Sequence, residues 1–292
     1  DDMLKKALDK ELTIADSPDC LKDCEHIVIS VPTPLTDYQP DLSYVKAAAK
    51  TIAENITKDQ VIILESTTYP GTTIEVLIPE IESISQLKSG KDFYVGYSPE
   101  RIDPGNKTWN FKNTPKVVGG ISPECTQLAA SVYETNIEKV VQVSSTKCAE
   151  LVKLLENTFR SVNIGMANEM ALICDKLGVD VWEVIDAAAT KPFGFMPFYP
   201  GPGLGGHCIP IDPLYLSWRL KSLNFEARLI SLAEDINKKM PDQVVQKTIL
   251  GLNEIHKSVK NSNILILGVA YKKDINDVRE SPAFDVMTLL EN

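Results

Sequence analysis

The segment from Gly201 to Pro213, GPGLGGHCIPIDP, contains the residues best suited to covalent chemistry. Cys208 lies in a glycine-rich loop, where exposed backbone N–H groups can stabilise a thiolate. Asp212 follows four residues later and offers a carboxylate that could place a water molecule. These residue types predict a nucleophilic cysteine that forms a covalent intermediate, which water then releases.

Three glycines of this segment, Gly201, Gly203 and Gly206, also fit the spacing GxGxxG of a dinucleotide-binding loop. That loop needs a strand before it and a helix after it, so that the pyrophosphate meets a helix N-terminus. Prolines occur before and among these glycines, at 197, 200 and 202, and after them, at 210 and 213, and they disfavour such elements. We therefore interpret the glycines as residues of a compact irregular loop that lets another group approach the backbone closely.

A second group of polar residues lies on a long, largely apolar helical stretch. Lys153, Asn157 and Arg160 fall within about 60° of one another at 100° per residue. A solvated helix face is the alternative, but such a face usually carries interspersed acids and i, i+4 ion pairs. A lysine in this position could move a proton, and with Asn157 it could polarise a developing oxyanion.

Three loops follow predicted strands at their carboxyl ends, the edge at which open α/β sheets bind ligands. A cap or a turn would explain each loop taken alone, but three on one edge predict a ligand site. The third loop offers Glu100 and Arg101. The loops are VPTPL at 31–35, STTYPGTT at 66–73 and SPERIDPGN at 98–106.

A fourth segment, residues 271–282, gathers basic side chains ahead of a predicted helix that starts at Ser281 and Pro282. In an acidic chain, a local basic cluster before a helix start favours a diphosphate group. The basic residues are Lys272, Lys273 and Arg279.

Short β-branched runs that alternate with amphipathic stretches predict the element order of the first half. The runs are apolar on both faces, which favours a mostly parallel sheet in an α/β fold. Helical spacing covers 43–56 and 72–82, and Thr72 with Glu75 predicts a capping box at the start of the second helix. The predicted strands are 26–31, 61–65, 93–97, 116–120 and 139–143.

From Ser144 the pattern becomes helical. We expect a long helix up to Leu177, a shorter one at 180–189 and further helix at 226–260 with a break at Pro241. Residues 262–270, SNILILGVA, predict a buried strand that opens a second α/β domain.

Composition narrows the class of protein. The chain has 292 residues with 30 basic and 40 acidic side chains, and its net charge of −10 argues against a nucleic-acid partner. No apolar run approaches the roughly 18 residues of a membrane helix, and no signal segment opens the sequence. The six cysteines show no zinc or disulfide spacing. We therefore expect a cytoplasmic protein that binds no membrane and no metal.

Taken together, these motifs resemble the nucleotide-sugar 6-dehydrogenases of the UDP-glucose/UDP-N-acetylmannosamine dehydrogenase family. The resemblance runs from about residue 20 to the end and is carried by SVPTP, ESTTYPGTT, SPERIDPGN, KLLENTFR, GPGLGGHCIPIDP and AYKKDINDVRESP. It implies a Rossmann-like NAD-binding domain at 1–143 without its GxGxxG part, and a central helical dimerisation and catalytic domain at 144–260. Residues 261–292 would then begin a second Rossmann-like domain that binds UDP and that is truncated here.

The same resemblance implies an NAD-dependent, two-step oxidation of a sugar C6 alcohol to a carboxylate. Cys208 would be the nucleophile and Lys153 the proton donor and acceptor, with Asn157 beside it. Asp212 would orient water, and Glu100 would assist hydrolysis of the thioester. The enzyme would be a homodimer or a higher oligomer with the long helix as its core. The implied substrate contacts are Arg101, Ile102, Lys153, Asn157, Arg160, Gly205, Tyr271 and Lys272, and the implied NAD contacts are Thr33, Thr67 and Arg279.

Two departures indicate the branch of the family. The UDP-glucose enzymes carry a lysine three residues after the catalytic cysteine and an acid four residues after the glutamate, where this sequence has Ile211 and Pro104. The resemblance therefore favours the N-acetylhexosamine branch, with a UDP-glucose 6-dehydrogenase as an alternative. Within that branch we expect UDP-N-acetylglucosamine rather than UDP-N-acetylmannosamine.

Two further hypotheses remain open. One is a single-step dehydrogenase of β-hydroxy acids, which shares the lysine and asparagine but needs no cysteine. The other is an inactive dimerising fragment that does not bind NAD, because the GxGxxG loop of the family does not occur in this sequence at the expected place.

Overall fold

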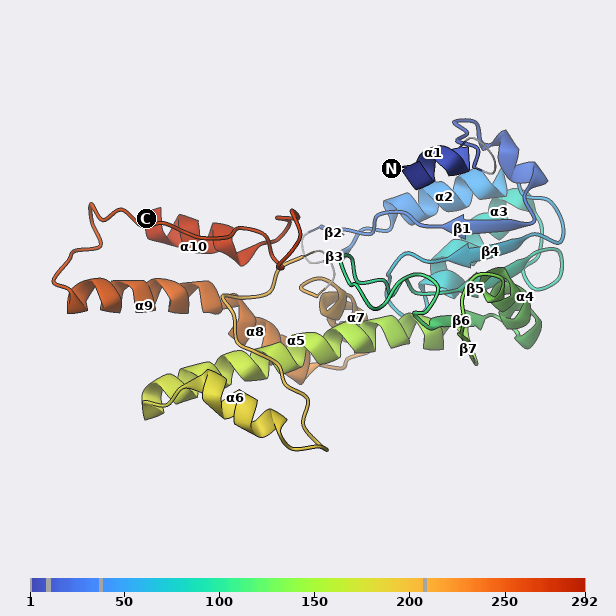
Figure 1. Ribbon diagram of the computed structural model, residues 1–292. Helices are drawn as coiled ribbons and strands as arrows, with labels where there is room; N and C mark the ends of the chain where they lie inside the picture. Colours follow the sequence, from blue (N-terminus) through green and yellow to red (C-terminus); the bar gives the residue numbers. More distant parts are fainter. Residues whose placement is uncertain (1, 9–11, 37–38, 207–208, 292) are drawn as a thin grey trace. The chain divides into compact units, whose positions relative to one another are not determined.

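The structure is a computed structural model, which describes the chain except for residues 1, 9–11, 37–38, 207–208 and 292 (Figure 1). The chain divides into two compact units. The first comprises Asp1–Thr36 and Pro40–Lys153, and the second comprises Asp37–Gln39 and Leu154–Asn292. Helix α5 (Thr146–Leu177) begins in the first unit and continues in the second.

A five-stranded sheet forms the centre of the first unit, in the order β1-β4-β5-β6-β7. Strands β1, β4 and β5 are parallel neighbours, and β6 and β7 are parallel to each other. All five predicted runs are strands, so the mostly parallel sheet of an α/β fold is confirmed. The bounds are β1 (His26–Ile29), β4 (Val61–Leu64), β5 (Tyr94–Tyr97), β6 (Lys116–Gly120) and β7 (Val140–Val143).

The direction of β6 was not predicted: β6 runs antiparallel to β5, with Tyr97 opposite Gly119. The long connection between these strands contains no helix in residues 98–115, whereas parallel neighbours need a crossover. Because of this reversal, Lys116 at the start of β6 lies beyond the carboxyl end of β5. A separate two-stranded sheet pairs β2 (Leu35–Thr36) with β3 (Gln39–Pro40).

Helix α4 (Pro123–Glu134) packs closely against β4, β5, β6 and β7. Ser122 caps its start by accepting a hydrogen bond from the Cys125 N–H at 3.1 Å. A Cβ atom at Gly96 would lie 2.7 Å from the Ala129 Cβ atom, so glycine permits the close approach of the helix. The apolar cluster beneath α4 comprises Val61, Ile63, Val118, Ala129, Ala130, Tyr133 and Ile137.

The helices on the amino-terminal side of the first unit follow the predicted pattern with one correction. They are α1 (Asp2–Leu8), η1 (Pro18–Asp23), α2 (Ser43–Ala53), the π-helical turn η2 (Thr73–Leu77) and α3 (Ile78–Ser85). The predicted capping box is wrong, because Thr72 is itself helical and its hydroxyl donates to the Tyr69 carbonyl at 2.8 Å. The Glu150 carboxylate on α5 instead accepts the N–H groups of Gly71 and Thr73.

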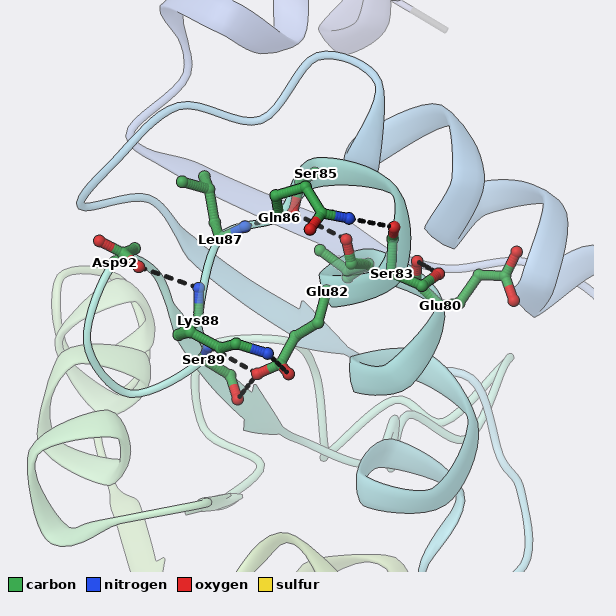
Figure 2. Close-up of polar contacts among 10 residues, drawn as sticks. Glu80, Glu82, Ser83, Ser85, Gln86, Leu87, Lys88, Ser89 and Asp92 are labelled. Atoms are coloured by element: carbon green, nitrogen blue, oxygen red, sulfur yellow. Dashed lines mark hydrogen bonds and ion pairs between the residues drawn. The ribbon is translucent and has the colours of Figure 1, made fainter.

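The turn after α3 is fixed by Glu82, as Figure 2 shows. Gln86 ends the helix in the left-handed region, with φ 61°. The Glu82 carboxylate accepts hydrogen bonds from the N–H and the hydroxyl of Ser89, each at 2.9 Å, and pairs with Lys88. The Ser89 N–H is the main cause that lowers the pKa of Glu82. This network directs the chain into β5.

The second unit is helical, as predicted. After α5 it contains α6 (Val181–Ala189), α7 (Asp212–Lys221), α8 (Arg228–Lys238), α9 (Met240–Glu254) and α10 (Pro282–Glu291). The expected break lies between α8 and α9, with Pro241 in the first turn of α9. None of the helices in the described ranges is long and apolar enough to cross a membrane.

The predicted buried strand at 262–270 is wrong for this structure. The segment has no strand assignment, and Leu265 and Leu267 are 80% and 85% exposed. A strand needs a neighbour to which its N–H and C=O groups can bond, and none of the described strands pairs with this segment. Apolar β-branched residues alone therefore do not form a strand here.

Candidate active site

The three predicted loops do share one edge of the sheet. Because β1, β4 and β5 are parallel neighbours, the loops 31–35, 66–73 and 98–106 all leave from their carboxyl ends. Ser66 ties the first two together, since its hydroxyl contacts both the N–H and the C=O of Val31 at 2.8 Å.

Hydroxyl groups gather where these two loops meet. The Thr33 hydroxyl donates to the Thr67 carbonyl at 2.8 Å, so two predicted cofactor contacts are neighbours. The adjacent Thr68 hydroxyl is buried and has no hydrogen-bond partner among the described residues. A buried polar group is normally paired, so this hydroxyl is a candidate for a bond to a ligand.

Glu150, which sequence reasoning missed, holds the second loop in place. Its buried carboxylate accepts bonds from the Gly71 N–H at 2.5 Å, the Thr73 N–H at 2.9 Å and the Thr73 hydroxyl at 2.7 Å. Burial raises the pKa of Glu150 and outweighs these hydrogen bonds, which lower it. Gly71 has φ +110°, and a Cβ atom there would lie 2.7 Å from the Glu75 carboxylate.

A cluster of charged groups lies behind the third loop. Lys116 pairs with Glu65 at 2.8 Å and with Glu100 at 3.2 Å, although its side chain is only 5% exposed. The Tyr133 hydroxyl donates to Glu65 at 2.7 Å. Sequence reasoning identified Glu100 but missed the other three residues. Two of them could have been noticed in the sequence, because Lys116 begins one apolar strand run and Glu65 ends another.

The charges in this cluster affect the protonation of Glu100. Burial acts to raise the pKa of this carboxyl, but the Lys116 charge and the N–H groups of Ile102 and Arg101 outweigh it, so the pKa is lowered. Burial, followed by the negative charge of Glu65, raises the pKa of Tyr133, which keeps its hydroxyl protonated as a donor.

Lys153 and Glu100, both predicted site residues, are in contact within the first unit. The Lys153 ammonium donates to the main-chain carbonyl of Glu100 at 2.6 Å. The neighbouring Arg101 guanidinium donates to the Pro115 carbonyl at 2.6 Å, and the side chain of Ile102 is exposed. The loop 98–106 is thus attached both to α5 and to the segment before β6.

In the second unit, Asn157 and Asp212 form a buried pair. The Asn157 side-chain amide on α5 donates to the Asp212 carboxylate at the start of α7 at 2.5 Å. Arg160, one turn further along α5, donates to the Asn157 side-chain oxygen at 3.4 Å. The polar stripe predicted on the long helix therefore reaches the segment that follows the cysteine loop.

The glycines before the cysteine pack against Tyr271. A Cβ atom at Gly205 would lie 2.5 Å from the Tyr271 Cβ atom, and one at Gly206 would lie 2.8 Å from the tyrosine ring. The Gly206 N–H also donates to the Arg279 carbonyl at 3.0 Å. The close approach that we expected of this loop is confirmed for these glycines. Cys208 itself, the predicted nucleophile, lies outside the described residues.

The segment 271–282 borders a cavity of about 370 Å³ in the second unit. Its contribution to the wall is Glu280, Ser281 and Pro282, and not the three basic residues. The Arg279 guanidinium pairs with Asp277 at 2.6 Å, whereas the Ser281 hydroxyl accepts the Ala283 N–H and thus caps α10. Lys272 is partly buried, and Lys273 is exposed.

No group of three or more His, Cys, Asp or Glu residues in the described part of the chain is arranged to hold a metal ion. The polar groups along the sheet edge include hydroxyls, carboxylates, ammonium groups and the Arg101 guanidinium. They are suited to hydrogen bonding and to proton transfer.

Comparison with known families gives three matches along the chain. The NAD binding domain of the UDP-glucose/GDP-mannose dehydrogenase family matches residues 1–137, its central domain matches 147–239, and its UDP binding domain matches 265–292.

Individual relatives agree with these matches. Protein CapL of Staphylococcus aureus is 38% identical over 93% of this chain and 64% of its own length. The UDP-N-acetyl-D-glucosamine 6-dehydrogenase of Pseudomonas aeruginosa is 36% identical over 97% of this chain and 67% of its own length. The structure of a UDP-D-ManNAc dehydrogenase from Pyrococcus horikoshii matches this chain with a TM-score of 0.94 and 37% identity. The match covers 100% of this chain and 69% of the Pyrococcus horikoshii chain.

The chain thus spans about two thirds of the length of the relatives that it matches. The matches also confirm the Rossmann-like fold and the family resemblance that the motifs indicated. On this evidence the chain belongs to the UDP-glucose/GDP-mannose dehydrogenase family.

Proposed function

We propose that the protein is an NAD-dependent dehydrogenase that oxidises the C6 alcohol of a UDP-N-acetylhexosamine to a carboxylate in two steps. The observation that carries this proposal is the contact between Lys153 and Glu100, two residues that the motifs assign to proton transfer and to hydrolysis. Membership of the family supports it, as do relatives that are named for UDP-N-acetylglucosamine and UDP-N-acetylmannosamine.

The sheet edge of the first unit fits NAD as a ligand. The buried Thr68 hydroxyl, which no described residue hydrogen-bonds, lies beside Thr33 and Thr67, at the edge where α/β sheets bind nucleotides. We assign Thr33, Thr67 and Arg279 to NAD binding. NAD, when bound, supplies the acceptor for the hydride that leaves C6 in each oxidation.

The residues of the chain supply the proton transfers. The proton of the C6 hydroxyl must leave when the alcohol becomes an aldehyde, and the Lys153 side chain in its neutral amine form is the group that takes it. Lys153 and Asn157 lie one turn apart on α5 and together stabilise charge on the C6 oxygen. Asp212, bonded to Asn157, orients a water molecule.

Covalent chemistry belongs to Cys208. Its thiolate adds to the aldehyde carbon to form a thiohemiacetal, and the second oxidation converts this into a thioester. Water then cleaves the C–S bond with the help of Glu100, which releases the acid and the thiol. The remaining contacts to the substrate are assigned to Arg101, Ile102, Arg160, Gly205, Tyr271 and Lys272.

We propose UDP-N-acetylglucosamine as the preferred substrate. HCIPID and SPERIDPGN are similar to the N-acetylhexosamine branch, and within that branch we favour the glucosamine epimer. The test is NADH formation by the complete protein with UDP-N-acetylglucosamine, UDP-N-acetylmannosamine and UDP-glucose side by side. The expected order of kcat/KM follows that sequence of sugars. A higher value for UDP-N-acetylmannosamine would correct the epimer, and a higher value for UDP-glucose would support the alternative branch.

The assembly and the domain limits are part of the same proposal. Exposed apolar side chains along α5, namely Leu151, Leu155, Phe159, Met166, Ile173 and Leu177, support a homodimer with this helix at its core. The domain limits 1–143, 144–260 and 261–292 are supported by the three family matches, each of which lies within one of them. The five cysteines in the described ranges are free thiols, which supports a cytoplasmic location.

A further inference from the structure

Lys116 is a buried cation at the edge of the sheet that carries the loop 98–106. Its side chain is 5% exposed, and its ammonium contacts the carboxylates of Glu65 at 2.8 Å and Glu100 at 3.2 Å. The antiparallel direction of β6 places it there, because Lys116 begins β6 three residues before Gly119, which lies opposite Tyr97 at the end of β5.

Stability alone does not account for this buried lysine. Taking a charge out of water is costly, and replacing a buried ion pair by apolar residues is often neutral or stabilising. Its surroundings are nevertheless closely fitted to it, because the ammonium also lies 5.0 Å from the centre of the Tyr133 ring. The same tyrosine donates its hydroxyl to Glu65 at 2.7 Å.

The two carboxylates that Lys116 joins differ in their access to water. The side chain of Glu65 is 15% exposed, whereas that of Glu100 is 46% exposed. One oxygen of Glu100 accepts the N–H groups of Arg101 at 2.7 Å and Ile102 at 2.6 Å, and the other accepts Lys116. Glu100 is therefore fixed in orientation and still reachable from outside, while Glu65 is enclosed.

We propose that Lys116, held by Glu65 and Tyr133, is a positioning residue that keeps the Glu100 carboxylate ionised and oriented as the base for thioester hydrolysis. This inference rests on the proposed function, because it assigns a helper to one step of that reaction. Lys116 acts through Glu100 and itself contacts no substrate.

The hydrolytic step balances without any oxidant. The water oxygen attacks the thioester carbon while the Glu100 carboxylate takes one proton of the water. The C–S bond then breaks, and its electron pair leaves with the Cys208 sulfur as a thiolate. Glu100 passes its proton to that thiolate or to solvent, and the acid product loses the second proton of the water to solvent and leaves as a carboxylate.

The charge of Lys116 has a defined effect on this step. Burial acts to raise the pKa of Glu100, and Lys116 is the first of the groups that lower it. Loss of Lys116 should therefore raise the pKa of Glu100 and move the acid limb of the kcat profile to higher pH. The titratable and charged groups around Glu100 are Lys116 on β6, Lys153 on α5, Arg101 in its own loop, Glu65 after β4 and Tyr133 on α4.

The test compares Lys116→Met with the wild type in the complete protein. We expect a burst of two NADH per subunit followed by a stall, with kcat lower by about ten- to a hundredfold and KM little changed. Intact-protein mass spectrometry should find the acyl group on the protein during the stall. Lys116→Arg, which keeps the charge, should restore most of kcat and return the acid limb towards the wild-type position.

A second variant separates positioning from folding. Glu65→Gln combined with Lys116→Met removes both enclosed charges, and an amide oxygen can still accept the Tyr133 hydroxyl. We expect this double variant to regain the thermal stability that Lys116→Met loses. Its kcat should stay as low as that of Lys116→Met. Recovery of kcat together with stability would show a merely structural role and overturn the inference.

A measurement independent of turnover completes the test. The carboxyl carbon of Glu100, labelled with ¹³C and assigned with Glu100→Gln, should titrate at higher pH in Lys116→Met than in the wild type. If Glu100 titrates at the same pH in Lys116→Met as in the wild type, and the wild type forms NADH normally, this inference is overturned while the proposed function stands. A wild type that forms no NADH with any of the three sugars would overturn the proposed function and this inference with it.

Discussion

Asn157 and Asp212 show how a single buried contact joins segments that are distant in the sequence. The amide donates to a carboxylate that is only 4% exposed, and such a bond to a buried charged group is worth more than one between neutral groups. The bond fixes the first turn of α7, which directly follows the cysteine loop. We therefore expect changes at Asn157 to alter both folding and activity.

Asn157→Asp tests this contact through its pH dependence. Two carboxylates would then face each other in a buried site, so at least one pKa would be raised. If the pKa of a carboxyl is higher in the folded than in the unfolded protein, stability is intact below the unfolded-state pKa. Stability is then lost as the pH rises through the folded-state pKa. The variant should be destabilised by about 2–4 kcal/mol at pH 8 and much less at pH 4.5 in urea unfolding.

Asn157→Ala is the matched control, because it removes the amide without adding a charge. Its loss of stability should depend far less on pH than that of Asn157→Asp. Equal losses for Asn157→Asp at both pH values would contradict a direct contact with Asp212.

Individual site residues could be predicted from the sequence, but most of their contacts could not. Sequence reasoning identified Asn157, Asp212, Lys153 and Glu100, but it could not pair Asn157 with Asp212 across 55 positions. It missed Lys116, because a lysine at the start of a strand is normally exposed. The reversal of β6 is what buries it, and no residue pattern in the long connection revealed that reversal.

At the level of secondary structure, α5 positions the loop 66–73 by means of Glu150. The carboxylate takes the place that a capping residue would have at the start of η2, and it also satisfies the Gly71 N–H. The loop that carries Thr67 and Thr68 is therefore attached to the long helix. Its geometry does not depend on the local sequence alone.

Glu150→Gln should be destabilising despite its similar shape. One carboxylate oxygen becomes an NH₂ group, which then faces an N–H or O–H donor in a buried site. The expected loss is about 1–3 kcal/mol in urea unfolding. Glu169→Gln, an exposed position on the same helix, should change stability by less than about 0.5 kcal/mol. A Glu150→Gln variant as stable as this control would contradict the assigned role.

Strand positions followed from β-branched runs. Such runs are buried throughout in β4 and β6, although the edge strands β1 and β7 are partly exposed. The capping box failed for a tertiary reason, since Glu150 lies 77 positions away from Thr73. The predicted strand at 262–270 failed for a different reason. A strand needs a neighbouring strand to pair with, and none of the described strands pairs with this segment. Elements defined by their own sequence were thus predictable, and elements defined by a partner were not.

At the scale of the whole molecule, each unit holds part of the proposed chemistry. The first unit contains the hydroxyl-rich sheet edge and the contact of Lys153 with Glu100, and the second contains the Asn157–Asp212 pair and the glycines before Cys208. Helix α5 is continuous through the boundary after Lys153.

The central claim is a two-step oxidation through a covalent bond to Cys208, and the stoichiometry of NADH tests it most directly. With UDP-N-acetylglucosamine, the complete wild-type protein should form two NADH per sugar acid. Cys208→Ser should form no acid and should stop at or before the aldehyde. One NADH per product in the wild type, or normal acid formation by Cys208→Ser, would contradict the account and favour a single-step dehydrogenase.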